Sequence, residues 1–353
     1  MAILLSDCTH SRDNNFNLMR FIAASMVLFG HCYPLSGSPH QEPLSQYGIT
    51  FGDLAVDIFF ITSGFLVARS LMIRQDIISF ATARALRIFP ALIVAVLFSV
   101  FVVGLAFTTL PADAFLKHPA VSTYLFNNIT LVLQPTAFVL PNVFESNPYK
   151  QSVNGSLWTL PWEMNMYILL AMLGSLVFIK PSFFSLKTFK WIIIAIVVVS
   201  LPLHIINHLF HFSKIPFFTA GTHFLTIFFM GALFFIFQER IFLSKRLFGI
   251  GLLVIFYALN YKVIFFPVYT ILLGYLVLYL AYVPNGFIRH FNKLGDYSYG
   301  VYIYAFPVQQ SIAALVPTID VARLFIYAFV VTLSLAILSW HFIEKPALQL
   351  KAT

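Results

Sequence analysis

The stretch FNLMRFIAASMVLFGHCY, residues 16–33, decides the fold because it is too long and too apolar for an ordinary soluble helix. It nevertheless carries two ionisable side chains, Arg20 and His31. Eleven residues at about 100° each make about three turns, so both side chains share one helical face, about 16 Å apart along the axis. An ionisable residue inside a membrane span is costly and usually faces a protein-lined cavity. The pair therefore predicts a polar track through the bilayer.

The composition of the whole chain agrees with a membrane location. Of the 353 residues, 60% are hydrophobic and 10% are charged, whereas soluble domains carry about 25% charged residues. We therefore expect an all-α, polytopic membrane protein. The net charge of +8 is interpreted as orientation by cytoplasmic Lys and Arg, and we expect no nucleic-acid partner.

Hydropathy predicts ten transmembrane helices of the length that a bilayer requires. The shortest connector, Asn260 to Lys262, separates the seventh and eighth. The predicted spans are 16–34, 54–73, 88–110, 157–178, 190–206, 216–237, 247–261, 263–283, 298–316 and 321–342.

The distribution of basic residues predicts that both termini are cytoplasmic. With the amino terminus inside, the inner segments carry fifteen Lys and Arg against five outside, leaving out Arg20 within its span. This bias is typical of cytoplasmic loops. No cleavable signal peptide is apparent, so the first span is expected to remain as an anchor.

The topology sorts the ionisable residues by depth. His31, Asp57 and Glu163 are predicted near the outer face, with Glu163 about 9 Å below it. Arg20 and the basic pair Arg84 and Arg87 are predicted at the cytoplasmic end. Acid/base groups are thus expected outside and guanidinium groups inside.

Each group has a chemical interpretation and a simpler alternative. The i, i+3 spacing of Arg84 and Arg87 places both guanidinium groups on one face, where they suit a phosphate or pyrophosphate; the alternative is a pair of topology determinants. A His with carboxylates at similar depth is a usual general-base arrangement. The alternatives are an intramembrane His satisfied by a neighbouring helix and, for Glu163, the carboxylate of a proton-coupled transporter.

Three further histidines, His204, His208 and His211, have a spacing that could bind a metal. They lack a convincing carboxylate or Cys partner, so no metal site is expected. His341 and Glu344 close the last span and are expected to be interfacial anchors.

The two cysteines, Cys8 and Cys32, predict no disulfide framework. One precedes the first span and the other lies within it.

Six motifs together resemble acyltransferase family 3, the integral-membrane enzymes that O-acylate bacterial surface glycans and other acceptors. The resemblance runs over nearly the whole chain. It rests on Arg20 and His31 eleven residues apart, GDLAVDIFFITSGFL at 52–66, RALRIFP at 84–90, SLWTLPWE at 156–163, LGDYSYGVY at 294–302 and FIEKP at 342–346.

The resemblance implies a single membrane-embedded acyltransferase domain over residues 1–353, with no appended soluble or SGNH-type domain. It implies a multi-pass protein of the bacterial plasma (inner) membrane, surrounded by lipid, that binds no cofactor permanently. The donor would be cytoplasmic acetyl-CoA, or another acyl-CoA. The acceptor would be a hydroxyl of a carbohydrate, such as a surface polysaccharide or lipid-linked glycan.

Carried over to this chain, the family pattern makes His31 the catalytic His and Arg20 its partner. Arg84 and Arg87 would help hold the CoA phosphates, and Glu163 would be the acid/base or orienting carboxylate. Asp57 or Glu163 would stabilise the imidazolium that forms when His31 accepts the hydroxyl proton.

One position departs from the pattern. Many members carry a His in the ninth span where this chain has Ala305.

Two mechanisms and two other function classes stay open. We expect direct transfer to the acceptor hydroxyl, and a covalent acyl-His route is a second mechanism compatible with the sequence. The main alternative function is a glycan or lipid transporter or flippase without acyl chemistry, although the chain shows no internal symmetry. A non-catalytic membrane scaffold is the third possibility.

Overall fold

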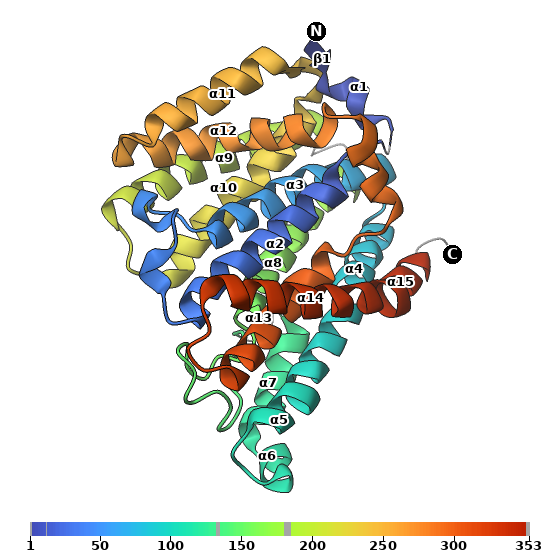
Figure 1. The fold of residues 1–353 in the computed structure, drawn as a ribbon. Coiled ribbons are helices and arrows are strands. Elements are labelled where there is room, and N and C mark those ends of the chain that lie inside the picture. Colours follow the sequence, from blue (N-terminus) through green and yellow to red (C-terminus); the bar gives the residue numbers. More distant parts are fainter. Residues whose placement is uncertain (1, 12, 132–134, 180–184, 351–353) are drawn as a thin grey trace.

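The computed structural model describes residues 2–11, 13–131, 135–179 and 185–350. They form a helical bundle, as expected from the composition (Figure 1). One small antiparallel pair, β1 (Ala2–Leu4) with β2 (Phe242–Ser244), joins the amino terminus to the segment after the sixth long helix. The α-helices are α1 (Leu5–Thr9), α2 (Phe16–Leu35), α3 (Phe51–Arg74), α4 (Ile77–Phe98), α5 (Leu105–Phe107), α6 (Ala112–Lys117), α7 (Pro119–Thr130), α8 (Leu160–Ile179), α9 (Leu186–Phe210), α10 (Pro216–Ile236), α11 (Lys245–Ala258), α12 (Lys262–Tyr282), α13 (Ser298–Leu315), α14 (Val321–Ser339) and α15 (Lys345–Gln349).

Eight helical segments of the described residues are long and apolar enough to cross a membrane. The fold is therefore a multi-pass helical bundle, but this number is smaller than the ten predicted spans. The eight segments are Phe16–Leu35, Phe51–Arg74, Ile77–Phe107, Gly155–Phe178, Leu186–Phe210, Pro216–Ile236, Lys262–Tyr282 and Val321–Gln349.

The predicted seventh span, 247–261, corresponds to α11, which has 14 residues. At 1.5 Å per residue it is about 21 Å long, shorter than a hydrocarbon core of about 30 Å. The short connector to α12 is confirmed, because α11 ends at Ala258 and α12 begins at Lys262. The two helices form a hairpin at one edge of the bundle (Figure 1).

The predicted ninth span corresponds to α13, which is long enough but not apolar enough to be among the eight. The reason is its surroundings: it packs against α2 and α14, and nearly all of its residues are buried. Its two glutamines donate hydrogen bonds inside the protein. Gln309 donates to the carbonyl of Leu28 at 2.8 Å, and Gln310 donates to the carbonyls of Tyr149 and Ser152, each at 2.7 Å.

The third long helix begins at Ile77 instead of residue 88, because Asp76 caps it by accepting a hydrogen bond from the backbone of Ile78. A π-helical turn at Ser99–Gly104 extends it towards Phe107. Arg84 and Arg87 consequently lie within this helix and point into the bundle from its second and third turns.

Contacts at one end of the bundle gather the amino terminus and several loops. The backbone carbonyl of Thr9 accepts from Arg69 at the end of α3, and Asp13 forms an ion pair with Arg289. Arg20 lies at this same end, since it is only five residues into α2. His31 lies at the opposite end, next to the loop that leads to α3.

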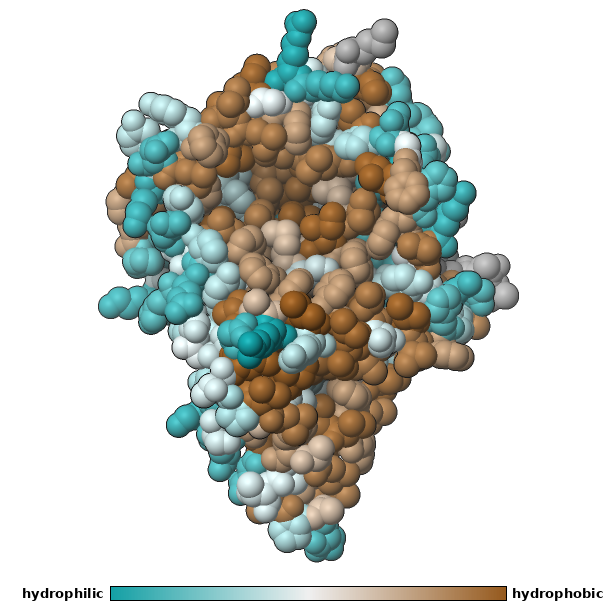
Figure 2. All heavy atoms as spheres, in the orientation of Figure 1, coloured by the Kyte–Doolittle hydropathy of each residue, from teal (hydrophilic) through white to brown (hydrophobic). Residues whose placement is uncertain are grey.

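The outer surface of the bundle suits lipid. Leu253, Phe256, Val263, Ile326 and Val330 are each more than half exposed. Figure 2 shows broad hydrophobic areas, with hydrophilic residues gathered towards the margins of this face. An apolar surface of this size on a helical bundle is typical of contact with hydrocarbon.

Two glycines allow α3 and α10 to approach closely. A Cβ on Gly64 would lie 1.9 Å from the carbonyl oxygen of Phe228, and one on Gly231 would lie 2.2 Å from that of Ile61. Small residues at such crossings let membrane helices pack backbone to backbone. This crossing also brings Asp57 on α3 towards α10.

We expect Gly64→Ala to separate these two helices and to lower the stability by about 1–3 kcal/mol, the usual cost of overpacking. The thermal unfolding midpoint of the detergent-solubilised protein measures the effect. Gly249→Ala on α11 is the matched control, because its Cβ would have no neighbour within 4 Å. An unchanged midpoint in Gly64→Ala would contradict the close crossing.

Candidate active site

Helix α2 presents Arg20 and His31 to cavities at its two ends. Arg20 lines a narrow pocket of about 30 Å³ together with Phe59 and Tyr302. His31 lines a second pocket of about 230 Å³, which also contains Val27 from the same helical face. The predicted common face of Arg20 and His31 is therefore confirmed.

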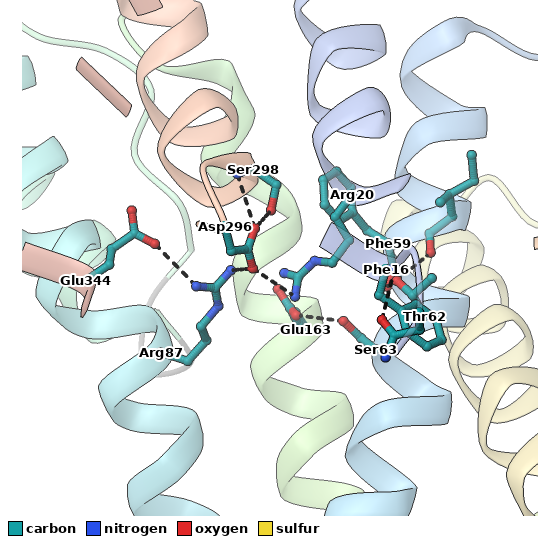
Figure 3. Close-up of polar contacts among 12 residues, drawn as sticks. Phe16, Arg20, Phe59, Thr62, Ser63, Arg87, Glu163, Asp296, Ser298 and Glu344 are labelled. Atoms are coloured by element: carbon teal, nitrogen blue, oxygen red, sulfur yellow. Dashed lines mark hydrogen bonds and ion pairs between the residues drawn. The ribbon is translucent and has the colours of Figure 1, made fainter. Parts of the chain in front are cut away.

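A cluster of ionic contacts fills the Arg20 end (Figure 3). Arg87 lies between two carboxylates, 2.6 Å from Asp296 and 3.3 Å from Glu344. Arg20 lies 3.7 Å from Asp296. The cluster joins α2, α4, the segment before α13 and the π-helical turn after α14, Trp340–Glu344, so it connects four parts of the bundle.

Asp296 remains ionised in this cluster. Burial alone would raise its pKa, but Arg87 and then Arg20 outweigh burial, so the pKa of Asp296 is lowered overall. Its contribution to stability is therefore present above its ordinary pKa of 3.8 and is lost as the pH falls through the lowered value.

Glu163 belongs to the Arg20 end and not to the His31 end. It accepts a hydrogen bond from Ser63 at 3.2 Å and another from Tyr167, and it lines the narrow pocket with Arg20. Ser63 lies six residues after Asp57 on α3, which is about 9 Å further along the helix. The predicted common depth of Glu163 and Asp57 is therefore wrong.

The reason for this depth lies in the segment before α8. Asn154 donates to the carbonyl of Ile303 in the middle of α13 at 2.9 Å, and Tyr302 donates to the carbonyl of Ser156 at 2.7 Å. The chain is thus already inside the bundle when its 3₁₀ turn, Gly155–Thr159, begins. Glu163 lies a few residues further along the chain, and therefore deeper in the bundle.

Asp57 is paired with a histidine that the sequence analysis did not single out. Its carboxylate lies 2.5 Å from Nε2 of His223 on α10 and accepts from the hydroxyl of Tyr269 on α12 at 2.7 Å. The signal that could have found His223 is the one used for His31: a lone ionisable residue inside an apolar span.

The carboxylates that share a pocket with His31 are Glu42 and Asp53. Glu42 is buried and accepts a hydrogen bond from the backbone of Phe51 at 2.5 Å, and burial raises the pKa of its carboxyl group. Asp53 and Thr50 form a capping box at the start of α3. That T-x-x-D pattern is readable from sequence, whereas nothing in the loop sequence distinguishes Glu42.

His31 itself keeps a free ring nitrogen. Its Nδ1 is buried and has no hydrogen-bond partner among the described residues. The ring meets Phe306 edge to face at 5.1 Å. His31 also lines a third pocket, of about 580 Å³, whose wall includes residues of the loop 138–155. An unpaired imidazole nitrogen beside two cavities is suited to accept a proton.

Comparison with known proteins shows the family of the chain. A sequence model described as an acyltransferase domain matches residues 13–341. The chain belongs to acyltransferase family 3. An "O-acetyl transferase" of Shigella phage Sf6 is 31% identical over 345 residues, covering 95% of this chain and 96% of the relative. "Nodulation protein 10" of Rhizobium leguminosarum bv. viciae is 30% identical over 381 residues, covering 96% and 94%. No solved structure matches the chain.

Within this acyltransferase, the two arginines of the RALR motif differ in their surroundings. Arg87 is held by two carboxylates, whereas Arg84 has none within ion-pair distance among the described residues. Arg84 is largely buried, its guanidinium lies 5.8 Å from the ring centre of Tyr167, and its Nε lacks a partner. Arg84 is therefore the arginine with capacity for an anion.

His341 and Glu344, in the turn after α14, were both predicted to be interfacial anchors. Glu344 is 2% exposed and is bonded to Arg87 and to Ser339, so the prediction of an interfacial anchor is wrong for this residue. His341 is exposed, with its ring 6.3 Å from that of Tyr297.

The remaining candidates are three histidines and two cysteines. No group of three metal-ligating side chains occurs within the part of the chain that the structure describes. His204 stacks on His223 and His208 stacks on Phe266. Cys8 and Cys32 are both free thiols.

Proposed function

We propose that this acyltransferase moves an acetyl group from acetyl-CoA to a hydroxyl of a carbohydrate acceptor. The donor enters from the Arg20 end, which we assign to the cytoplasm, and the acceptor binds at the His31 end. The protein would thus work in the bacterial inner membrane, with both termini cytoplasmic. The distribution of positive charges supports this orientation, and the name of the phage relative supports the transfer of an acetyl group.

The observation that carries the proposal is a line of pockets along α2. The narrow pocket at Arg20 and the larger one at His31 share Val56 and Tyr302 as wall residues. A long, thin donor such as the pantetheine arm of CoA fits a narrow passage of this kind. Its thioester would then lie near His31, while its phosphates stay at the arginine end.

The arginine end offers a binding site for the phosphates of CoA. Arg84 and Arg20 each have a buried Nε without a partner in the described residues. A guanidinium group binds phosphate oxygens through two parallel hydrogen bonds. Arg87 has its charge balanced by Asp296 and Glu344, so we assign it to holding the helices in place.

At the other end, His31 acts as the general base. It takes the proton from the acceptor hydroxyl as the oxygen attacks the thioester carbonyl. The carbon–sulfur bond breaks, and the proton passes from the imidazolium to the thiolate, which leaves as free CoA. Glu42 and Asp53 stabilise the imidazolium through the charge they bring to the pocket, in place of the Asp57 or Glu163 expected from the sequence.

The direct test uses the wild-type protein in lipid nanodiscs with acetyl-labelled CoA and a crude cell-envelope glycan extract. We expect label to appear in the glycan as a base-labile ester, with one free CoA released for each ester formed. Omitting the extract abolishes labelling of the glycan fraction and serves as the control.

The same protein in sealed vesicles tests the transporter alternative. Movement of unmodified glycan across the membrane without any use of acetyl-CoA would contradict the acyltransferase proposal. Label that enters only phospholipid would show that the acceptor class is wrong.

A further inference from the structure

A fourth cavity, also at the His31 end, has no role in the mechanism above. It has a volume of about 480 Å³ and lies between α3, α9 and α10. Its polar wall residues include Asp53, Asn207, His208, His211 and His223. We call it the α9–α10 pocket. It is large enough for a small molecule or for one unit of a polymer.

A fixed imidazole forms one wall of this pocket. The Nε2 of His223 is bonded to Asp57, whose second oxygen accepts from Tyr269. The ring of His223 is stacked on that of His204, 4.8 Å away and 6° from parallel. With Nε2 engaged, Nδ1 is the ring atom that His223 can offer to the hydroxyl of a ligand.

An exposed indole forms another wall. Trp158 is 41% exposed and lines the pocket. One side of it packs on Phe224, with ring centres 5.5 Å apart. An indole ring has a large apolar face and a polar N–H group, so it suits a ligand that has both C–H faces and hydroxyl groups.

The α9–α10 pocket communicates with the catalytic histidine. Asp53 lines both this pocket and the pocket of His31, and Trp158 lines both of these and the pocket beneath the 138–155 loop. A ring seated against Trp158 would therefore have His31 within reach of a neighbouring substituent.

The charge of the wall decides the ligand class. Asp53 and Asp57 contribute carboxylates, and none of the described residues that line the pocket is a Lys or an Arg. Asp57 is paired with His223, whereas Asp53 has no ion-pair partner among the described residues. The carboxylate of Asp53 would therefore repel a phosphate or an anionic lipid headgroup. Sugar hydroxyls both donate and accept, which matches a wall of carboxylate, amide and imidazole groups.

We propose that the α9–α10 pocket binds a neutral sugar ring of the acceptor, with Trp158 as the stacking surface and His223, held by Asp57, as a hydrogen-bonding and positioning group. This proposal rests on the proposed function for the acetylation of the bound sugar. Binding of a sugar in the α9–α10 pocket can be tested separately from the transfer reaction.

The binding test uses histidine modification by diethyl pyrocarbonate in the full-length protein in nanodiscs, without acetyl-CoA. The probe is the neutral oligosaccharide fraction released from cell envelopes by mild acid. We expect the modification rates of His208 and His211, measured by peptide mass spectrometry, to fall several-fold. His10 and His290, exposed at the opposite end, are the internal controls and should react unchanged.

The kinetic test uses two variants of the stacking surface. We expect Trp158→Ala to raise the half-saturating glycan concentration about ten-fold, with the KM for acetyl-CoA unchanged. Trp158→Phe should restore most of the affinity because it keeps an aromatic face. A merely structural role for the indole would instead lower kcat and thermal stability in both variants.

The outcomes separate the two proposals. Protection of His208 and His211 without any acetyl transfer would overturn the proposed function and support the sugar site. Transfer with no protection and an unchanged half-saturating concentration in Trp158→Ala would overturn the sugar site. Protection only by the acidic oligosaccharide fraction would also overturn it, because the ligand class would be wrong.

Discussion

We expect His31→Ala to lose nearly all acetyl transfer while the protein stays folded and inserted. General acid–base groups contribute about a hundred- to ten-thousand-fold in rate, and no other histidine lines the pocket that His31 shares with Glu42 and Asp53. The expected loss of kcat therefore falls in that range. The measurement is the amount of label incorporated into the glycan extract per molecule of folded protein.

The controls separate loss of a base from loss of the fold. The side chain of His31 packs edge to face on Phe306, so His31→Gln keeps more of the packing and should be equally inactive. His290→Ala, at the exposed opposite end, should keep full activity. Full activity in His31→Ala would contradict both direct transfer and an acyl-His route.

A single-turnover version of the assay distinguishes these two routes. Direct transfer releases no CoA until the acceptor is present, because the hydroxyl itself breaks the thioester. An acyl-His route releases one equivalent of CoA in a burst before acceptor is added. The wild-type protein without glycan extract supplies this measurement.

The long helices could be predicted from sequence because lipid contact requires apolar residues over a fixed length. A helix, α13, lies where the ninth span was predicted, but it is less apolar than the eight segments. It is buried in the protein, where Gln309 donates to the carbonyl of Leu28 and Gln310 to that of Ser152. Hydropathy reports the surroundings of a helix, so a helix surrounded by protein can carry polar residues that lower its mean hydropathy. It also overestimated α11, which is apolar but too short.

The two ends of the candidate site were predictable because Arg20 and His31 share one helix, whose geometry is known. The partners were not, because pairing between helices depends on tertiary packing. His223 lies 166 residues after Asp57 and meets it only through the close crossing of α3 and α10. Glu163 was misplaced because the depth at which the chain enters the bundle is set by the bond from Asn154 to α13.

The arginines of the RALR motif should respond to mutation in opposite ways. Arg87→Ala leaves Asp296 and Glu344 buried without their partner, and breaking a buried pair in this way costs about 3–5 kcal/mol. We expect a large fall in the amount of folded protein and in its thermal midpoint. Arg87→Lys should recover only part of this, because a single ammonium cannot replace the fork between two carboxylates.

Arg84→Ala should instead leave the protein folded and weaken donor binding. Its guanidinium forms no ion pair with a carboxylate among the described residues. Removing it therefore leaves no carboxylate unpaired and takes one buried charge out of the protein. A charged hydrogen bond to phosphate is worth about 1.5–3 kcal/mol, which corresponds to a rise of about ten- to a hundred-fold in the KM for acetyl-CoA. Dephospho-CoA and CoA thioesters compared in both variants locate the phosphate concerned. Two results would contradict these assignments: an unchanged KM for acetyl-CoA in Arg84→Ala, or a stable Arg87→Ala protein with only a raised KM. Either result would exchange the two roles, because the arginine that binds the donor must be the one whose charge the protein leaves unbalanced.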